Sequence, residues 1–237
     1  MSNNFKIVVT GGSGRFGKIL KEKVGLNYIF PKKSQLNILK INSILKYLKK
    51  TKPKYLIHLA GLSRPLNIHE KNIERSINLN IVGTANVTIA CNKLNIKLIY
   101  FSTSYVYDGK KGNYNEEDPV KPFNNYGLSK LGGECAARMY NNSLVLRITM
   151  TEKPFNHKKA FTNLKSNFMF HEDLAKILPK LINKKGIFNV GGKSQSVYSF
   201  AKSKNCQVKK IKLKKSLNLP LNQTMNLSKL NKMLLQK

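Results

Sequence analysis

Tyr126 and Lys130 form the pair of side chains in this sequence that is best suited to move a proton. Residues four apart lie on the same face of a helix, so the phenol and the ammonium would project together. A free phenol has a pKa of about 10, and a neighbouring cation favours the phenolate and lowers that pKa by roughly 1–3 units. We therefore expect Tyr126 to donate a proton to a carbonyl oxygen, with Lys130 lowering its pKa. Taken alone, the spacing also fits an exposed helix face in a lysine-rich chain.

A glycine-rich segment provides the second chemical signal, because it directly follows a short apolar run at residues 5–9. Glycines spaced in this way allow a strand to turn sharply into a helix and let a pyrophosphate approach the backbone. The free N–H groups and the dipole at the start of that helix favour the negative charge of the phosphate. The expected dinucleotide-binding residues in this segment are Gly11, Gly12, Ser13, Gly14, Arg15, Phe16 and Gly17.

The residues after the second expected strand indicate which dinucleotide is preferred. NAD-selective sites carry an acidic residue about 20 residues after the glycines, where it binds the ribose hydroxyls and repels a 2′-phosphate. Here the strand at residues 27–30 runs into Pro31-Lys32-Lys33-Ser34, without a carboxylate. NADP(H) is therefore favoured over NAD(H), which is the alternative. Arg15 and Lys32 are expected to meet the 2′-phosphate.

The elements that must position these residues follow an alternating pattern of apolar runs and amphipathic segments, which is typical of stacked βαβ units. Strands are expected at residues 6–10, 27–30, 55–59, 97–102, 143–148 and 187–190. Helices are expected at residues 14–24, 41–49, 73–94, 126–140 and 173–181, the last capped by Asp173. The pattern predicts an α/β fold with a Rossmann-type doubly wound parallel sheet. Residues 1–150 form its nucleotide-binding domain, and residues 151–237 form a small, abbreviated C-terminal substrate lobe, partly interleaved with the sheet.

Composition narrows the class of protein further. The 237 residues are 41% hydrophobic and carry a net charge of +32, which raises the question of nucleic-acid binding. Arginine, the residue favoured for base recognition, occurs only at positions 15, 64, 75, 138 and 147, so codon bias toward lysine explains the charge better. The dense basic cluster at residues 202–215 remains a candidate interaction patch.

Cys91, Cys135 and Cys206 are isolated, which argues against disulfides and a metal site. No signal peptide or membrane span is evident, and we expect a cytoplasmic protein without specific nucleic-acid or membrane partners.

In this order, the motifs resemble those of the short-chain dehydrogenase/reductase superfamily. The closest likeness is to its extended branch, which acts on nucleotide sugars, and especially to reductases of the dTDP-4-dehydrorhamnose type. The segment Ser102-Thr103-Ser104-Tyr105-Val106-Tyr107-Asp108-Gly109 is similar to a signature of those reductases, and its spacing to Tyr126 also fits. Further family-like segments lie at residues 56–61, 78–84, 144–147, 171–175, 186–192 and 219–230.

The resemblance implies a role for individual residues. It makes Thr103, Tyr126 and Lys130 catalytic, and it places Ser63, Thr103, Ser104 and Tyr126 at the substrate. Besides the glycine segment and Lys32, the cofactor-binding residues that it implies are Asn37, Leu59, Ala60, Gly61, Asn80, Tyr126 and Lys130.

The implied activity is NADPH-dependent reduction of the 4-keto group of a nucleotide-linked deoxy sugar, in the synthesis of surface polysaccharides. Ser104-Tyr105 stands where the related dehydratases place an acidic pair, so elimination of water is not expected. Two alternatives stay open, a nucleotide-sugar epimerase and a catalytically silent dinucleotide-binding regulatory subunit. The family's helix pairs around residues 73–94 and 126–140 also leave a homodimer open. Because the chain between Arg147 and Phe170 is shorter than in relatives, neither the sugar nor the base is determined.

Overall fold

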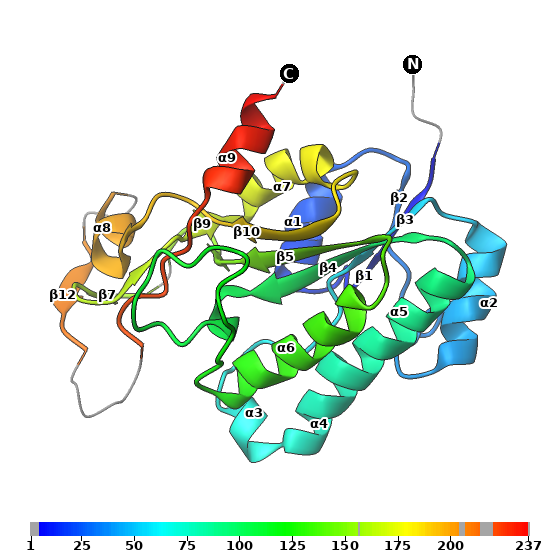
Figure 1. The fold of residues 1–237 in the computed structure, drawn as a ribbon, viewed down its shortest axis with the longest axis horizontal. Coiled ribbons are helices and arrows are strands. Elements are labelled where there is room, and N and C mark those ends of the chain that lie inside the picture. Colours follow the sequence, from blue (N-terminus) through cyan, green and yellow to red (C-terminus); the bar gives the residue numbers. More distant parts are fainter. Residues whose placement is uncertain (1–4, 156, 204–206, 214–219, 237) are drawn as a thin grey trace.

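A central sheet of six parallel strands organises the molecule in the computed structural model, which describes residues 5–155, 157–203, 207–213 and 220–236 (Figure 1). The strand order across the sheet is β10-β5-β4-β3-β1-β2. Its strands are β1 (Ile7–Thr10), β2 (Tyr28–Ile29), β3 (Tyr55–His58), β4 (Lys97–Thr103), β5 (Ser143–Ile148) and β10 (Gly186–Val190). They match the predicted strands to within one residue at each end, and the doubly wound α/β fold is confirmed.

Helices cover both faces of the sheet, which explains why its strands are almost continuously apolar. One face packs against α1 (Arg15–Lys23), α7 (His171–Leu181) and α9 (Ser228–Leu235). The opposite face packs against α2 (Ile41–Thr51), α5 (Gly83–Lys93) and α6 (Asn125–Arg138). Figure 1 shows these two layers above and below the strands. Helix α6 carries both residues of the predicted proton-transfer pair.

Two predictions about the helices need correction. The helix expected at residues 73–94 is divided into α4 (Ile73–Ile77), a π-helical turn η1 (Asn78–Val82) and α5, and it is preceded by an unpredicted short helix, α3 (Ile68–Lys71). Helix α7 begins at His171, and Asp173 lies in its first turn instead of capping it. A carboxylate in the first turn still interacts favourably with the helix dipole.

The part of the chain after residue 150 contributes to two regions. Helix α7 and strand β10 belong to the layers of the central sheet, where β10 pairs with β5. The remaining short elements are β6 (Met150–Thr151), β7 (Lys159–Phe161), β8 (Lys165–Ser166), β9 (Met169–Phe170), β11 (Gln195–Ser196), α8 (Val197–Lys202) and β12 (Lys209–Ile211). Several of them enclose a small apolar cluster that includes Phe155, Phe170 and Phe200. Cys206 and parts of the basic cluster at 202–215 lie outside the described residues.

No helix among the described residues has the length and apolar character needed to cross a bilayer.

The turn from β1 into α1 depends on glycine. Gly11 has a φ of 75°, and a Cβ atom at this position would lie 2.5 Å from the backbone nitrogen of Ala60. At Gly17, a Cβ atom would lie 2.5 Å from the carbonyl oxygen of Gly11. The segment therefore folds back on itself and against the end of β3 more closely than any side chain permits.

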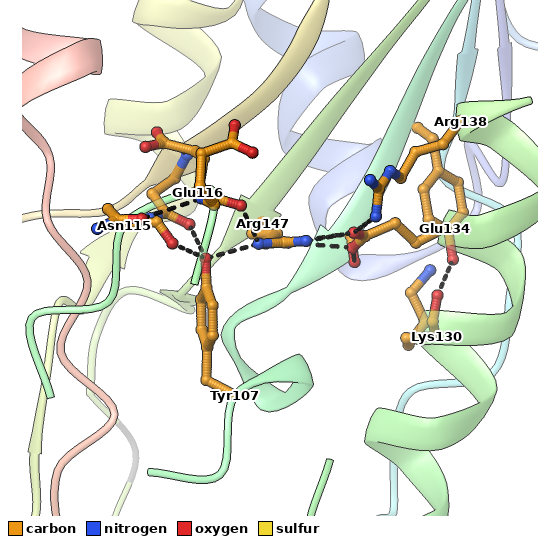
Figure 2. A network of polar contacts seen from close by, with 11 residues as sticks. Tyr107, Asn115, Glu116, Lys130, Glu134, Arg138 and Arg147 are labelled. Carbon is orange, nitrogen blue, oxygen red and sulfur yellow. Dashed lines mark hydrogen bonds and ion pairs between the residues drawn. The ribbon is translucent and has the colours of Figure 1, made fainter. Parts of the chain in front are cut away.

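A buried ion pair fastens α6 to the sheet, as Figure 2 shows. Arg147 on β5 donates from Nη2 to Oε1 of Glu134 on α6 at 2.7 Å, and both side chains are almost completely buried. The hydroxyl of Ser102 on β4 donates to the other carboxylate oxygen at 2.6 Å. Arg147 also donates from Nη1 to the Tyr107 hydroxyl at 2.8 Å. Burial disfavours the charged guanidinium, but Glu134 outweighs this effect and raises the pKa of Arg147.

We predict that Glu134→Gln lowers the free energy of unfolding by about 3–5 kcal/mol, because it leaves Arg147 charged and unpaired in the interior. Arg138→Gln is the matched control, since Arg138 approaches the same carboxylate at 3.9 Å with half of its side chain exposed. That change is expected to cost less than about 1 kcal/mol. Urea denaturation measures both, and equal losses in the two variants would contradict this interpretation.

Gly11→Ala is predicted to lower the free energy of unfolding by about 2–5 kcal/mol, the sum of left-handed backbone strain and a steric clash. Gly186→Ala separates these two terms, because Gly186 has a φ of 79° but no atom within 4 Å of the point that its Cβ atom would occupy. The control is expected to lose only the strain contribution, about 1–2 kcal/mol. If the two variants unfold at the same urea concentration, the steric clash with Ala60 contributes nothing to the loss in the free energy of unfolding.

Candidate active site

The strand order creates a crevice at the C-terminal ends of β1 and β3. From β1 the chain goes to β2 on one side and afterwards to β3 on the other, so the loops that leave β1 and β3 diverge. In open α/β sheets, ligands bind at this switch point. A cavity of about 500 Å³ lies there. It is lined by residues 10–14, Lys21, residues 30–33, residues 36–38, residues 59–61 and Leu79.

Most of the predicted cofactor-binding residues line this cavity. They are Gly11, Gly12, Ser13, Gly14, Lys32, Asn37, Leu59, Ala60 and Gly61. Gly14 occupies the N-cap of α1 without a capping side chain, and no acidic residue stands in the first turn. The backbone N–H groups at this end are therefore suited to an anion. The glycine cradle and the bare helix end fit the pyrophosphate of a dinucleotide.

Three other predicted cofactor residues do not line this cavity. Phe16 packs in the core, with its ring 5.4 Å from that of Phe101. Gly17 serves the close packing of the turn. Asn80 is buried. Its side-chain amide hydrogen-bonds the backbone of Leu62, in the loop after β3, and the hydroxyl of Ser129 on α6. We therefore interpret the Asn80 side chain as one that positions α6, not as one that contacts a cofactor.

Arg15 also departs from the expected position. Its guanidinium approaches Ser63 at 3.4 Å and Glu152 at 3.3 Å, and it lines a different cavity from Lys32 and Lys33. The expectation that Arg15 meets a 2′-phosphate together with Lys32 is therefore not supported. The sequence indicated that Arg15 lies beside the glycines, but the direction of its side chain depends on Glu152, which is 137 residues away.

A second cavity, of about 180 Å³, surrounds Tyr126 and contains the predicted substrate residues Ser63, Thr103 and Ser104. Thr103 ends β4, and its hydroxyl lies close enough to the Tyr126 phenol to affect the phenol's pKa. Burial raises the pKa of Tyr126 to about 12, although the Thr103 hydroxyl and the nearby Arg64 and Arg15 oppose this effect. The phenol therefore keeps its proton at neutral pH, which is the form that a proton donor requires.

Lys130 lies deeper than the sequence suggested. Its ammonium sits 4.3 Å from the centre of the Tyr100 ring, and it is not among the groups that set the pKa of Tyr126. Burial lowers the pKa of Lys130 to about 7, against the opposing effect of Glu134. The prediction that Lys130 lowers the phenol's pKa is thus wrong for this arrangement, because burial dominates both groups.

His69 is a neighbour of Tyr126 that the sequence analysis missed. It lies on α3 with its ring 5.1 Å from that of Tyr126, and its Nδ1 is 2.7 Å from the Ser76 hydroxyl. Tyr105 contacts the phenol ring from another side, with the ring centres 5.5 Å apart. Helix α3 is too short for a periodic apolar pattern, so the sequence held no signal that places His69 here.

A third cavity, of about 340 Å³, adjoins the second and is walled by aromatic side chains. It contains Phe123, Phe155, Phe161 and Phe168, together with His157 and Lys159. Arg64, Leu66, Tyr105, Thr151 and Phe168 line both cavities. A ligand that touches Tyr126 can therefore extend into an apolar space. Among the described residues, no three His, Cys, Asp or Glu side chains are grouped so as to hold a metal ion.

Comparison with known proteins supports the fold and the family. The chain is 31% identical over 156 residues to "Methionine adenosyltransferase 2 subunit beta" of Pongo abelii, a match that covers 61% of this chain and 46% of that protein. The chain thus spans about half the length of this relative.

Among solved structures, the chain is similar to dTDP-4-dehydrorhamnose reductase from Bacillus anthracis in complex with NADP, with a TM-score of 0.84 and 22% identity. That match covers 96% of this chain and 92% of the other. The Bordetella bronchiseptica enzyme WbmG in complex with NAD and UDP matches with a TM-score of 0.76 and 16% identity, over 98% of this chain and 87% of the other.

A family model described as "RmlD substrate binding domain" matches residues 5–168, which include the glycine turn and the residues around Tyr126. The expected superfamily is therefore confirmed, and this chain belongs to the RmlD substrate-binding-domain family of the extended short-chain dehydrogenases/reductases.

Proposed function

We propose that this protein uses NADPH to reduce the keto group of a sugar that is linked to a nucleoside diphosphate. The observation that carries the proposal is the Thr103–Tyr126 pair, a hydroxyl and a protonated phenol that line the same cavity beside the glycine turn. A bound nicotinamide supplies the hydride in such a reaction. Tyr126 then donates its proton to the oxygen of the substrate carbonyl, and Thr103 holds that oxygen against the phenol.

We assign Lys130 a role in binding the cofactor instead of in setting the pKa of Tyr126. Its buried amine titrates near neutral pH, and it stands one helical turn after Tyr126 on α6. We propose that it binds the ribose of the nicotinamide, where a hydroxyl would satisfy its charge better than the Tyr100 ring does.

The substrate class is supported by the paired cavities. A sugar ring fits the small cavity at Tyr126, and the aromatic cavity beyond suits a nucleobase, which stacks on such side chains. The structural neighbour solved with NAD and UDP indicates that this fold accommodates a nucleoside diphosphate. The place of the reaction in surface-polysaccharide synthesis is part of the proposal and follows from the likeness to dTDP-4-dehydrorhamnose reductases.

A second candidate function is that of a regulatory subunit without turnover. The 31% identity to a subunit of methionine adenosyltransferase supports it, since that relative is named as part of a larger enzyme. The layer of α4, α5 and α6 also exposes apolar side chains suited to a protein partner. The most exposed of them are Ile73, Ile77, Ile89 and Leu128, at 55%, 43%, 46% and 52%. The same surface is the one through which we propose a homodimer, and sedimentation analysis of the purified protein tests for it.

The reductase proposal predicts that the protein oxidises NADPH with at least one nucleotide-linked 4-keto sugar, and that Tyr126→Phe loses about 10²–10⁴-fold of that rate. The substitution removes the proton donor and keeps the ring, so NADPH binding is expected to persist in a fluorescence titration. Tyr47→Phe on α2 is the control, and its rate is expected to match that of the wild type. Full activity in Tyr126→Phe would overturn the mechanism, whereas NADPH binding without any turnover would favour the regulatory subunit.

Cofactor choice gives a second prediction. We expect tighter binding of NADPH than of NADH, and Lys32→Gln should narrow the difference about fivefold, as for one exposed charged contact of roughly 1 kcal/mol. Arg15→Gln removes the same charge from the neighbouring cavity and should leave the NADPH/NADH ratio unchanged. Titrations of both variants with NADPH and NADH at moderate salt measure this ratio. A ratio that responds to Arg15 and not to Lys32 would show that the arginine turns toward the 2′-phosphate after all.

A further inference from the structure

Two arginines at the mouth of the Tyr126 cavity share one carboxylate oxygen. Arg15 Nη1 lies 3.3 Å and Arg64 Nη1 lies 3.5 Å from Oε2 of Glu152. Arg15 begins α1, Arg64 lies in the loop after β3, and Glu152 directly follows β6. The three side chains thus join the nucleotide-binding layer to the C-terminal part of the chain across the cavity that contains Tyr126.

The use of arginine here is informative because the chain otherwise relies on lysine. Only five of the 43 basic residues are arginine. Arg147 and Arg138 are held by Glu134, and Arg75 is exposed on α4. Arg15 and Arg64 are the other two. Guanidinium groups bind phosphate and carboxylate oxygens in a planar fork that an ammonium cannot match.

The balance of charge at this point leaves room for another anion. Two guanidinium groups face a single carboxylate, and all three side chains are partly exposed, at 41%, 46% and 35% for Arg15, Arg64 and Glu152. Partly exposed ion pairs are weak, so a stronger anion can displace the carboxylate. The cavity also contains Ser104 and Thr149, whose buried hydroxyls have no hydrogen-bond partner among the described residues. The excess positive charge and the unpaired hydroxyls both fit a binding site for a polar, anionic ligand.

Arg64 occupies the junction between the two substrate cavities. It lines the 180 Å³ cavity that contains Tyr126 and the 340 Å³ aromatic cavity beyond it, whereas Arg15 and Glu152 line only the first. A ligand with its sugar at Tyr126 and its base among the aromatic side chains would place its linking group beside Arg64. In a nucleotide sugar that group is a diphosphate.

We propose that Arg64 and Arg15 form the binding site for the diphosphate of the substrate, and that Glu152 is a resident counter-ion which this diphosphate displaces. The inference rests on the proposed function, because it takes the sugar to lie at Tyr126. It also assigns Arg15 to the substrate and away from the 2′-phosphate of the cofactor. Glu152 then acts as a selectivity element, since a neutral or weakly anionic ligand cannot release it.

The test is calorimetric titration of the NADPH-saturated protein, in which the cofactor's own phosphate sites are filled. The probes are UDP and dTDP, compared with uridine and thymidine. The diphosphates are expected to bind more tightly than the nucleosides, and Arg64→Gln should remove about tenfold or more of that difference, as for a lost charged hydrogen bond. Glu152→Gln should tighten the binding of the diphosphates several-fold, because the competing carboxylate is gone. Arg64 is half exposed, so its replacement is expected to leave the fold intact.

Arg75→Gln is the matched control, because it removes the same charge from the exposed surface of α4. It should reproduce the wild-type affinities at moderate salt. The proposal is overturned if the wild-type protein binds neither diphosphate, if Arg64→Gln binds them as the wild type does, or if Glu152→Gln weakens binding as much as Arg64→Gln. In the last case the glutamate supports the arginines and does not compete with the ligand.

Turnover separates this inference from the proposed function. If the protein binds UDP or dTDP through Arg64 but oxidises no NADPH with any keto sugar, the diphosphate site stands and the proposed reductase activity is overturned. If Arg64→Gln reduces a keto sugar with the same KM as the wild type, the proposed activity stands and the diphosphate site is overturned.

Discussion

The buried ion pair between Glu134 and Arg147 is the interaction on which the arrangement of the candidate site depends. Helix α6 carries Tyr126 and Lys130, and β4 carries Thr103, so the reacting groups meet only if the helix has one position along the sheet. Glu134 defines that position, because it binds Arg147 on β5 and Ser102 on β4 at the same time. Apolar packing alone is non-directional and tolerates sliding, whereas a buried charge that is displaced from its partner is costly.

The same constraint affects the chemistry of the proton-transfer pair. Because α6 packs against the sheet, Tyr126 and Lys130 are both partly buried, and this burial raises the pKa of the phenol and lowers that of the amine. Each group is thereby held toward its neutral form. Thr103 and the two arginines at the cavity mouth partly oppose this effect on the phenol. The protein thus keeps a protonated donor in place at the cavity that Arg15 and Arg64 also line.

Much of the fold could be predicted because its signals are local. The apolar runs of the strands, the glycines of the first turn and the amphipathic helices each span fewer than about twenty residues, and these elements matched closely. The predictions that failed concern elements without a local signal. The π-helical turn at residues 78–82 is invisible to a periodic pattern, and it coincides with the position where Asn80 bonds to Leu62 and Ser129. Helix α3 is a single turn, so its His69 could not be placed beside Tyr126.

The amino-acid sequence by itself determined the fold class, the glycine turn that is suited to a dinucleotide, and the residue types of the phenol, hydroxyl and amine on which the proposed reaction depends. Periodicity and glycine geometry operate over short stretches of chain, so these features are legible without coordinates. Only the tertiary structure decided where the charged side chains point. Arg15 turns to Glu152, and Lys130 turns to Tyr100, because direction and burial depend on partners from distant parts of the chain. The energy of a charge depends on its surroundings in three dimensions, and those surroundings exist only after the chain has folded.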